Sequence, residues 1–421
     1  MREELTNLLK SEMKPALGVT EVGAIALAAA KAREAAGGKA KKVTMVMNGG
    51  MYKNAFACAI PGTEESGCEM AALLGVLCGE SALGLECLKG VTAEAVAEAK
   101  KGTIETDLSV DPEKEEIYIL AEVETDQGTG KALIETLHSN ITKVWKDGKV
   151  IFEAELKAAE AAKPFPFDTV EIADFVSYAK EVPAEEIAFV QDMIDMNCAL
   201  AAEGAKGAGL KIGAALDLFH EKGVLGDDMI YKAQHLTTAA MDARLAGLPF
   251  PAMSIVGSGS HGILCSMPVV SYGRSMGASD EDIRRAVALS GLVTIYSKHY
   301  TGRLSPLCGC VLGGGSGAAA GIVLLMGGGA KEVAAAMDHM AANLSGMICD
   351  GGSTGCALKA SAGVYSAFLS AMLAMAGTAM PPHFGVLGSR AEQTAKNLGR
   401  VSTEGMATMD ATILDIMQKG E

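Results

Sequence analysis

The chain has 421 residues, with 36 Lys and Arg against 51 Asp and Glu, so its formal net charge is −15. This acidic balance argues against a nucleic-acid partner, because binding to phosphates requires a basic surface. The 49% content of hydrophobic residues excludes a chain that is disordered throughout. The length predicts two or three domains, each large enough to bury a core.

The ten cysteines are too sparse in a chain of this size for a disulfide scaffold, and Met1 is not followed by a basic and then an apolar signal segment. We therefore expect a cytoplasmic protein whose thiols stay reduced and free to bind metal. The stretch from Leu304 to Ala330 is uncharged and long enough to cross a bilayer. Its proline and glycine triplets favour a buried helix between glycine loops, so no membrane partner is expected.

The predicted elements change in character along the chain. Helices are predicted over Glu3 to Lys14 and Thr20 to Ala36, the second capped by the Thr20 hydroxyl and ended by Gly37. Period-two alternation then predicts strands over Val43–Asn48, Thr103–Ser109, Glu116–Glu124 and Leu133–His138, a Lys143–Phe152 hairpin turning at Asp147-Gly148, and covering helices at Cys68–Cys78 and Thr92–Lys101. Helical periodicity follows to the end, over 183–204, Asp228–Ala246, Ser279–Ser297, Lys331–Ser345, Cys356–Ala376 and Ser402–Gln418.

These patterns predict an α+β fold with two domains. A mainly α-helical domain is assigned residues 1–38 and 166–421. A smaller α+β domain, made of an antiparallel sheet and helices, is assigned residues 39–165. The boundary follows the Pro164-Phe165-Pro166 stretch, after which the strand pattern nearly disappears.

The most informative motif is a pair of cysteines, Cys349 and Cys356, in a glycine-rich loop between two predicted helices. Cys308 lies 349 − 308 = 41 residues earlier, also where a loop meets a helix. Three thiolates on loops of small residues suit an iron–sulfur cluster, which is bulky and accepts backbone N–H groups at its sulfides. Ordinary buried cysteines are an alternative, and so is a zinc site completed by Cys310 or His339.

Further segments accompany these cysteines in chain order: Pro15 to Glu21, Lys53-Asn54, Pro61 to Thr63, Leu137 to Asn140, Asp192 to Gly204, Asp242 to Arg244, Pro251 to Ser254, Arg303 to Ser305 and Ser345 to Gly351. Together they resemble the L-cysteine desulfidase family (UPF0597), which belongs with the alpha subunit of bacterial iron–sulfur L-serine dehydratases. The resemblance covers nearly the whole chain.

The resemblance implies that a 4Fe-4S cluster is held by Cys308, Cys349 and Cys356, with one iron lacking a protein thiolate. That open iron binds substrate and acts as a Lewis acid. The implied reaction is an α,β-elimination on a small amino acid, such as L-cysteine to pyruvate, ammonia and hydrogen sulfide, without pyridoxal phosphate. The expected partner is this small-molecule substrate, and the sequence allows a homo-oligomer.

Charged and polar residues in the matching segments are the candidates for chemistry. The predicted catalytic residues are His261, Lys53 and Arg303, and the predicted substrate-binding residues are Asn54, His138, Asn140, Arg244 and Ser305. Four of them have structural alternatives: a surface or structural histidine for His261, a solvated loop lysine for Lys53, and an internal ion pair for Arg303 or for Arg244 with Asp242. Cys58 and Cys198 have no companion pattern and are predicted to be core thiols.

Two positions depart from the family pattern. Val19 stands where the family usually has a cysteine that is a proposed catalytic base, and valine can neither accept a proton nor bind iron. His261, in the Gly257 to Gly262 segment, stands where an amide is usual, so we expect an imidazole base or carboxylate contact on a glycine loop. A catalyst with another substrate and a non-catalytic cluster-binding or metal-binding protein are therefore alternatives.

Overall fold

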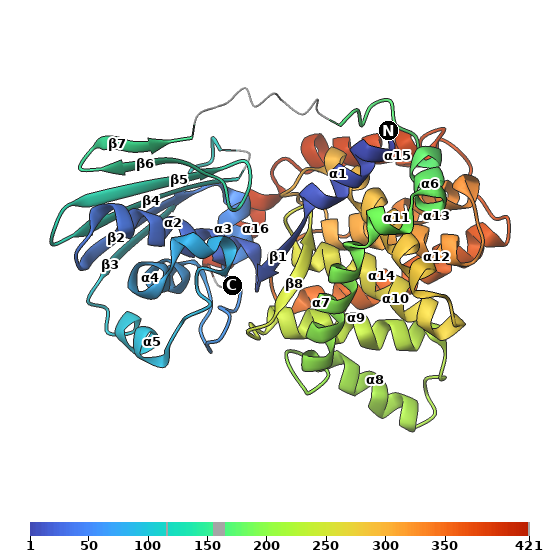
Figure 1. Ribbon diagram of the computed structural model, residues 1–421, viewed down its shortest axis with the longest axis horizontal. Helices are drawn as coiled ribbons and strands as arrows, with labels where there is room; N and C mark the ends of the chain where they lie inside the picture. Colours follow the sequence, from blue (N-terminus) through green and yellow to red (C-terminus); the bar gives the residue numbers. More distant parts are fainter. Residues whose placement is uncertain (115–116, 155–164, 420–421) are drawn as a thin grey trace.

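The structure is a computed structural model that describes residues 1–114, 117–154 and 165–419 (Figure 1). Residue 116, the expected start of the third strand, and the residues just before the expected boundary at 165 lie outside these ranges. A six-stranded sheet with packed helices forms one part, and many helices with a two-stranded sheet form the other. The α+β class predicted from the sequence is confirmed.

The large sheet has the order β3-β2-β4-β5-β6-β7. Its strands are β2 (Ala40–Met47), β3 (Glu105–Val110), β4 (Tyr118–Thr125), β5 (Thr129–Glu135), β6 (Ile141–Lys146) and β7 (Lys149–Glu153). The hairpin turns at Asp147 (φ 47°) and Gly148 (φ 76°), as predicted. The prediction of a wholly antiparallel sheet is wrong at one pair, since β2 and β3 run parallel. The helices between these two strands return the chain to the same end of the sheet.

Helix α2 (Thr20–Ala36) packs on the sheet, against β4 and β5, and against α4 (Cys68–Cys78). A Cβ at Gly130 of β5 would collide with the carbonyl oxygen of Ala32, so glycine permits this close approach. The remaining helices of this part are α3 (Gly49–Ala55), the 3-10 helix η1 (Ser81–Glu86) and α5 (Ala93–Ala99). The division of the chain into residues 1–38 plus 166–421 and residues 39–165 stays a prediction. That division assigns α2 to the helical domain, whereas the main contacts of α2 are with the large sheet and α4.

The helical part is built around α10 (Gly259–Met276), whose residues from Gly259 to Gly273 are all buried. The other helices are α6 (Ile172–Glu181), η2 (Ala184–Ile187), α7 (Val190–Gly204), α8 (Ile212–Glu221), α9 (Met229–Leu245), α11 (Asp280–Thr301), α12 (Gly315–Leu325), α13 (Ala330–Leu344), α14 (Gly355–Met375) and α15 (Ala391–Arg400). The last helix, α16 (Met409–Lys419), lies against α3 of the sheet part (Figure 1). The π-helical turns are η3 (Cys310–Gly314) and η4 (Val401–Gly405). One helix of the described residues, α14, is long and apolar enough to cross a membrane, and half of its most apolar window is buried.

The uncharged stretch from Leu304 to Ala330 forms a buried helical segment, η3 followed by α12. The expectation that Gly313 to Gly315 make a loop is wrong, because these glycines lie inside the helical segment. A Cβ at Gly317 would collide with the Ser290 carbonyl oxygen of α11. Small residues therefore let two helix backbones approach closely here.

The N-terminal segment joins the two parts. Helix α1 (Arg2–Glu12) is followed by strand β1 (Met13–Leu17), which pairs antiparallel with β8 (Pro251–Ile255). The predicted helix to Lys14 therefore ends earlier, because Met13 enters the strand pairing with Ile255. Leu17 pairs with Pro251, at the end of β8 away from α10. The start of α2 reaches the turn that leads into α10 through Thr20, whose hydroxyl lies 2.9 Å from the Gly257 carbonyl oxygen.

Candidate active site

Two cysteine-bearing loops are joined through their main chains. The Cys308 N–H donates to the Met347 carbonyl at 2.9 Å, and the Cys349 N–H donates to the Pro306 carbonyl at 2.7 Å. Leu307 and Ile348 form an isolated β-bridge between these contacts. Cys356 follows in the first turn of α14. The fold thus brings together the three cysteines that the sequence singled out.

The three thiols share one electrostatic environment. Cys308 is 4% exposed, and burial together with the nearby Cys349 thiol raises the pKa of Cys308 to about 12. Burial also raises the pKa of Cys356. Among the described residues, no three His, Cys, Asp or Glu side chains are grouped so that they could hold a single metal ion. An iron–sulfur cluster requires a different spacing of its ligands, since each thiolate binds a separate iron.

Lys298 of α11 is a buried lysine beside these loops. It is 2% exposed, and its Nζ donates to the Ser305 Oγ at 2.9 Å. No carboxylate lies within ion-pair distance of it among the described residues. Burial lowers the pKa of Lys298 to about 8, and the thiolate forms of Cys349 and Cys308 act in the opposite direction. A Cβ on Gly309 would lie 2.6 Å from its Nζ, and one on Gly313 would lie 3.1 Å from its Cγ, so glycines make room for this side chain.

His261 lies in the first turn of α10 and is 5% exposed, so the expectation of a glycine loop is wrong. Its Nδ1 contacts the Ile255 carbonyl at 3.3 Å, which fits an Nδ1–H tautomer. Burial and the nearby Lys298 charge lower the pKa of His261 to about 3. Its Nε2 lies 2.8 Å from the place of a Cβ on Gly309, on the side of the Lys298 amine. A neutral imidazole therefore faces the lysine.

Glu21 of α2 forms a second cluster. Its Oε1 accepts from the Asn54 amide at 2.9 Å and lies 3.8 Å from the His138 Nε2, and its Oε2 accepts from the Thr20 hydroxyl at 3.0 Å. Burial alone raises the pKa of Glu21, but the interactions with His138 and Asn54 prevail and lower it to about 2. The His138 contact is too long for a hydrogen bond and leaves the buried His138 Nε2 without a partner among the described residues.

The N-terminus of α2 departs from the predicted cap. Val19 is the N-cap residue, and the Thr20 hydroxyl lies 2.9 Å from the Gly257 carbonyl oxygen, so its single proton is shared between this carbonyl and the Glu21 carboxylate. A Cβ on Gly257 would lie 3.2 Å from the His138 Nδ1 and 3.6 Å from the Arg303 Nη1. The turn before α10 therefore gathers predicted residues from three separate parts of the sequence.

Lys53 is a fully buried residue of α3, so the alternative of a solvated loop lysine is wrong. Its Nζ donates to the Cys349 carbonyl at 2.9 Å and forms an ion pair with Asp410 of α16 at 2.7 Å. The next residue contributes further, because the Gly352 N–H donates to the Asn54 carbonyl at 3.1 Å. Helices α3 and α16 thus fix the loop that carries Cys349.

The two arginines have different partners. Arg303 forms an ion pair with Glu12 at 2.6 Å, as its structural alternative predicted. Arg244 is 3% exposed and donates from Nη1 to the Ser260 Oγ at 2.9 Å. It does not pair with Asp242, whose carboxylate instead accepts the Leu210 and Ile212 N–H groups at the start of α8. Burial lowers the pKa of Arg244.

Asn140 is engaged within its own turn, where its amide donates to the Glu135 carbonyl at 3.1 Å and to the Thr136 Oγ1 at 3.3 Å. This turn presents His138. The Ser305 hydroxyl both accepts from Lys298 and donates to the Leu307 carbonyl at 2.8 Å, beside Cys308.

The sequence reasoning missed Lys298, Glu21 and the position of Cys58. The predicted helix stopped at Ser297, one residue short of Lys298, although Lys298 continues the buried face of Gly291 and Thr294. The Cys58 thiol contacts the Asn54 and Gly352 carbonyls, each at 2.7 Å, and so lies at the cysteine loop. Nothing in the spacing of Cys58 indicated this, because the contact depends on how α3 packs against the loop.

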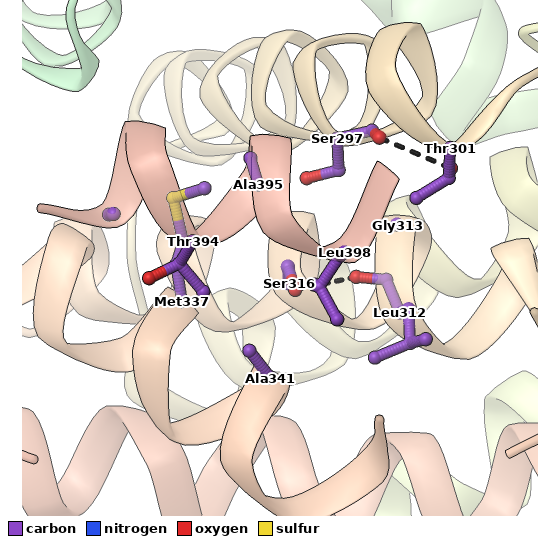
Figure 2. A pocket seen from close by; sticks show the side chains of 11 residues that line it. Ser297, Thr301, Leu312, Gly313, Ser316, Met337, Ala341, Thr394, Ala395 and Leu398 are labelled. Atoms are coloured by element: carbon purple, nitrogen blue, oxygen red, sulfur yellow. Dashed lines mark hydrogen bonds between the residues drawn. The ribbon is translucent and has the colours of Figure 1, made fainter. Parts of the chain in front are cut away.

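A small cavity lies nearby, but it is not this site. Figure 2 shows its lining from α11, η3, α12, α13 and α15, which includes Ser297, Thr301, Ser316 and Thr394. No titratable side chain lines it. Gly313 lines the cavity and also packs against the aliphatic part of the Lys298 side chain, so the cavity and the site are separated by this glycine.

Comparisons with known proteins identify the family of this chain. The family model described as serine dehydratase alpha chain matches residues 82–415. A UPF0597 protein of Clostridioides difficile strain 630 is 41% identical over 419 residues, covering 97% of this chain and 98% of the relative. A UPF0597 protein of Clostridium botulinum strain Hall is 39% identical over 420 residues, covering 98% of each chain. One from Caldanaerobacter subterraneus is 38% identical over 419 residues, covering 99% and 98%. The family name indicates a dehydratase-like lyase, and this chain belongs to the serine dehydratase alpha-chain family, among its UPF0597 members.

Proposed function

We propose that the protein is a 4Fe-4S-dependent lyase that removes the Cα proton and the β-substituent of a small amino acid. The first candidate substrate is L-cysteine, which with water gives pyruvate, ammonia and hydrogen sulfide; a hydroxy or other thiol analogue is the alternative. The observation that carries the proposal is the joining of the Cys308 and Cys349 loops by reciprocal main-chain hydrogen bonds beside the buried Lys298.

The residues present fit such a cluster. Cys308, Cys349 and Cys356 would hold it, and the Cys310 Sγ instead contacts the Ser260 carbonyl at 3.5 Å. The buried cation Lys298 suits a site of thiolates, because it forms no ion pair among the described residues and unpaired buried charges are costly. When bound, the cluster supplies an iron that lacks a protein thiolate, which is a Lewis acid and a soft partner for sulfur.

Lys298 is the better candidate for the proton acceptor. A base works best when its pKa lies near the operating pH, and burial lowers the pKa of Lys298 to about 8. His261, with its pKa lowered to about 3, would hold a transferred proton poorly. In this proposal His261 faces the amine as a neutral group, and Ser305 orients the amine through the 2.9 Å contact.

In this proposal Glu21 and His138, which lie at Asn54 and the Gly257 turn, also contact the substrate. The carboxylate stays ionised, since its pKa is lowered to about 2, and it can receive the substrate ammonium. Lys53 fixes the Cys349 loop and Arg303 flanks the Gly257 turn, so we assign them positioning roles.

The proposal is tested by anaerobic purification or reconstitution, visible spectra, and iron and sulfide analysis. Assays of pyruvate, ammonia and sulfide on L-cysteine and L-serine then identify the leaving group. A colourless preparation that binds zinc and no iron would refute the cluster. Sulfide release without pyruvate would indicate a desulfurase instead of a lyase.

A second candidate, a chain that binds the cluster without acting on cysteine, is favoured by one observation. Val19 Cγ1 lies 3.3 Å from the place of a Cβ on Gly352, so an apolar side chain touches the cysteine loop where the family usually has a thiol. Iron binding without turnover of either amino acid would support this candidate.

A further inference from the structure

We propose that the N-terminus of α10 and the Arg244 guanidinium form a carboxylate-binding subsite beside the three cysteines. The identity of the ligand, a small amino acid bound through its α-carboxylate, rests on the proposed function. The subsite itself rests on the described residues alone.

The first observation is the way α10 begins. Strand β8 ends at Ile255, and the chain reverses through Val256 (φ 49°) and Gly257 (φ 72°) before α10 starts at Gly259. The Ser258 N-cap side chain makes no capping hydrogen bond. Within the described residues, no hydrogen bond satisfies the backbone N–H groups of Gly259, Ser260 and His261. The positive end of an 18-residue helix is therefore free to bind an anion.

The second observation is independent and concerns Arg244. Its side chain is 97% buried, and its Nε has no hydrogen-bond partner among the described residues. A Cβ on Gly259 would collide with this Nε and would lie 3.0 Å from the Arg244 Cδ. An unpartnered guanidinium N–H is thus packed directly against the first residue of α10.

Charge favours a small anion at this point. No carboxylate lies within ion-pair distance of Arg244 in the described part of the chain, and the nearest candidate in sequence, Asp242, caps α8 instead. A guanidinium cannot lose its proton, and the Glu21 carboxylate whose charge reaches Arg244 forms no ion pair with it, so a directly bound anion is favoured. Backbone N–H groups together with an arginine N–H match the two oxygens of a carboxylate.

The subsite is close to the cysteines and open on one side. The Cys310 Sγ contacts the Ser260 carbonyl at 3.5 Å, which joins the first turn of α10 to the segment after Cys308. Gly257 and Ser258 keep partial solvent exposure, whereas Gly259 and Ser260 are buried. A carboxylate bound at Gly259 would hold the rest of an amino acid on the cysteine side.

The test measures binding to the full-length, metal-free chain by calorimetry, so that turnover plays no part. The probes are L-alanine, which has no β leaving group, and L-alaninamide, which lacks the carboxylate. We expect the amide to bind at least about tenfold more weakly, because a charged hydrogen-bonded group is lost. We expect R244Q to weaken L-alanine binding at least about tenfold, and S260A to weaken it about threefold through the lost Nη1 contact.

The matched control is R274Q, which removes an exposed arginine from the other end of the same helix. It should bind L-alanine within about twofold of the parent, since it contacts no part of the subsite. Equal binding of alanine and alaninamide, or unchanged binding by folded R244Q, would overturn the inference. If R244Q does not fold, unchanged binding by S260A decides against it.

The same preparations separate this inference from the proposed function. Alanine binding that depends on Arg244 in a chain that never binds iron would leave the subsite intact and refute the cluster lyase. Sulfide release from L-cysteinamide that is as fast as from L-cysteine, with pyruvamide formed in place of pyruvate, would refute the subsite and leave the lyase standing.

Discussion

Replacing Lys298 should make the protein more stable and less active. In the unfolded chain the lysine pKa is 10.5, whereas burial lowers it to about 8 in the folded chain. The difference corresponds to about 3 kcal/mol by which the folded state disfavours the charged amine at pH 7. Lys298→Met loses the hydrogen bond to Ser305, which contributes about 1 kcal/mol, so we expect a net gain of about 2 kcal/mol.

The stability difference between Lys298→Met and the parent should change with pH in a defined direction. Between about pH 8 and 10.5 the unfolded state binds more protons than the folded one, so the parent gains stability as pH rises. The advantage of Lys298→Met should therefore be largest at pH 7 and disappear near pH 10.5. Urea unfolding of the metal-free chain at several pH values measures it, with the exposed Lys331→Met as control. A methionine variant that is less stable at pH 7, or whose difference does not change with pH, would refute the reasoning.

Three other predictions concern the neighbouring groups. Single substitutions by serine should remove most bound iron at Cys308, Cys349 and Cys356, because a hydroxyl is a poor ligand for a soft metal, whereas Cys198→Ser should keep the parent iron content; full iron in Cys349→Ser would contradict the ligand set. Val19→Cys places a thiol at the N-terminus of α2, where the helix dipole favours the thiolate, and should raise sulfide release from L-cysteine; unchanged release would show that Val19 does not limit the reaction. Glu21→Gln should destabilise the chain by about 3 kcal/mol at pH 7, because the folded pKa of about 2 lies below the unfolded 4.5. That difference should shrink as pH falls from 4.5 toward 2, and a constant difference in urea unfolding would count against an ionised Glu21.

Local patterns sufficed for most of the elements. Helices α2 and α4 occupy the predicted ranges, because their boundaries depend on neighbouring residues such as Gly37 and Gly79. The start of α10 could not be found in this way. Gly257 and Gly259 were interpreted as a loop, yet only Gly257 needs its positive φ. Gly259 begins the helix, and it is glycine there because a Cβ would collide with Arg244.

In the candidate site, too, the residues in short motifs could be predicted, whereas the contacts between distant parts of the chain could not. The cysteines and His138 could be named from motifs, which are short stretches of sequence. The partner of Lys53 is Asp410, which is 410 − 53 = 357 residues away, and no local pattern predicts that contact. Lys298 was missed because a lysine near a helix end is usually solvated, whereas here glycines at 309 and 313 make space for it in the core.

Three buried ionisable residues of the candidate site lower the stability of the fold, and this cost is evidence about their role. Lys298, Arg244 and His261 are all buried, and burial disfavours the charged form of each. An apolar side chain would fit the fold better at any of these positions, and a structural role alone does not account for an unpaired buried cation. All three converge on the turn between β8 and α10 and on the segment after Cys308. Buried groups that weaken the fold and lie near the cysteine loops are consistent with the proposed lyase, in which binding of a charged substrate would supply the compensation that the protein alone lacks.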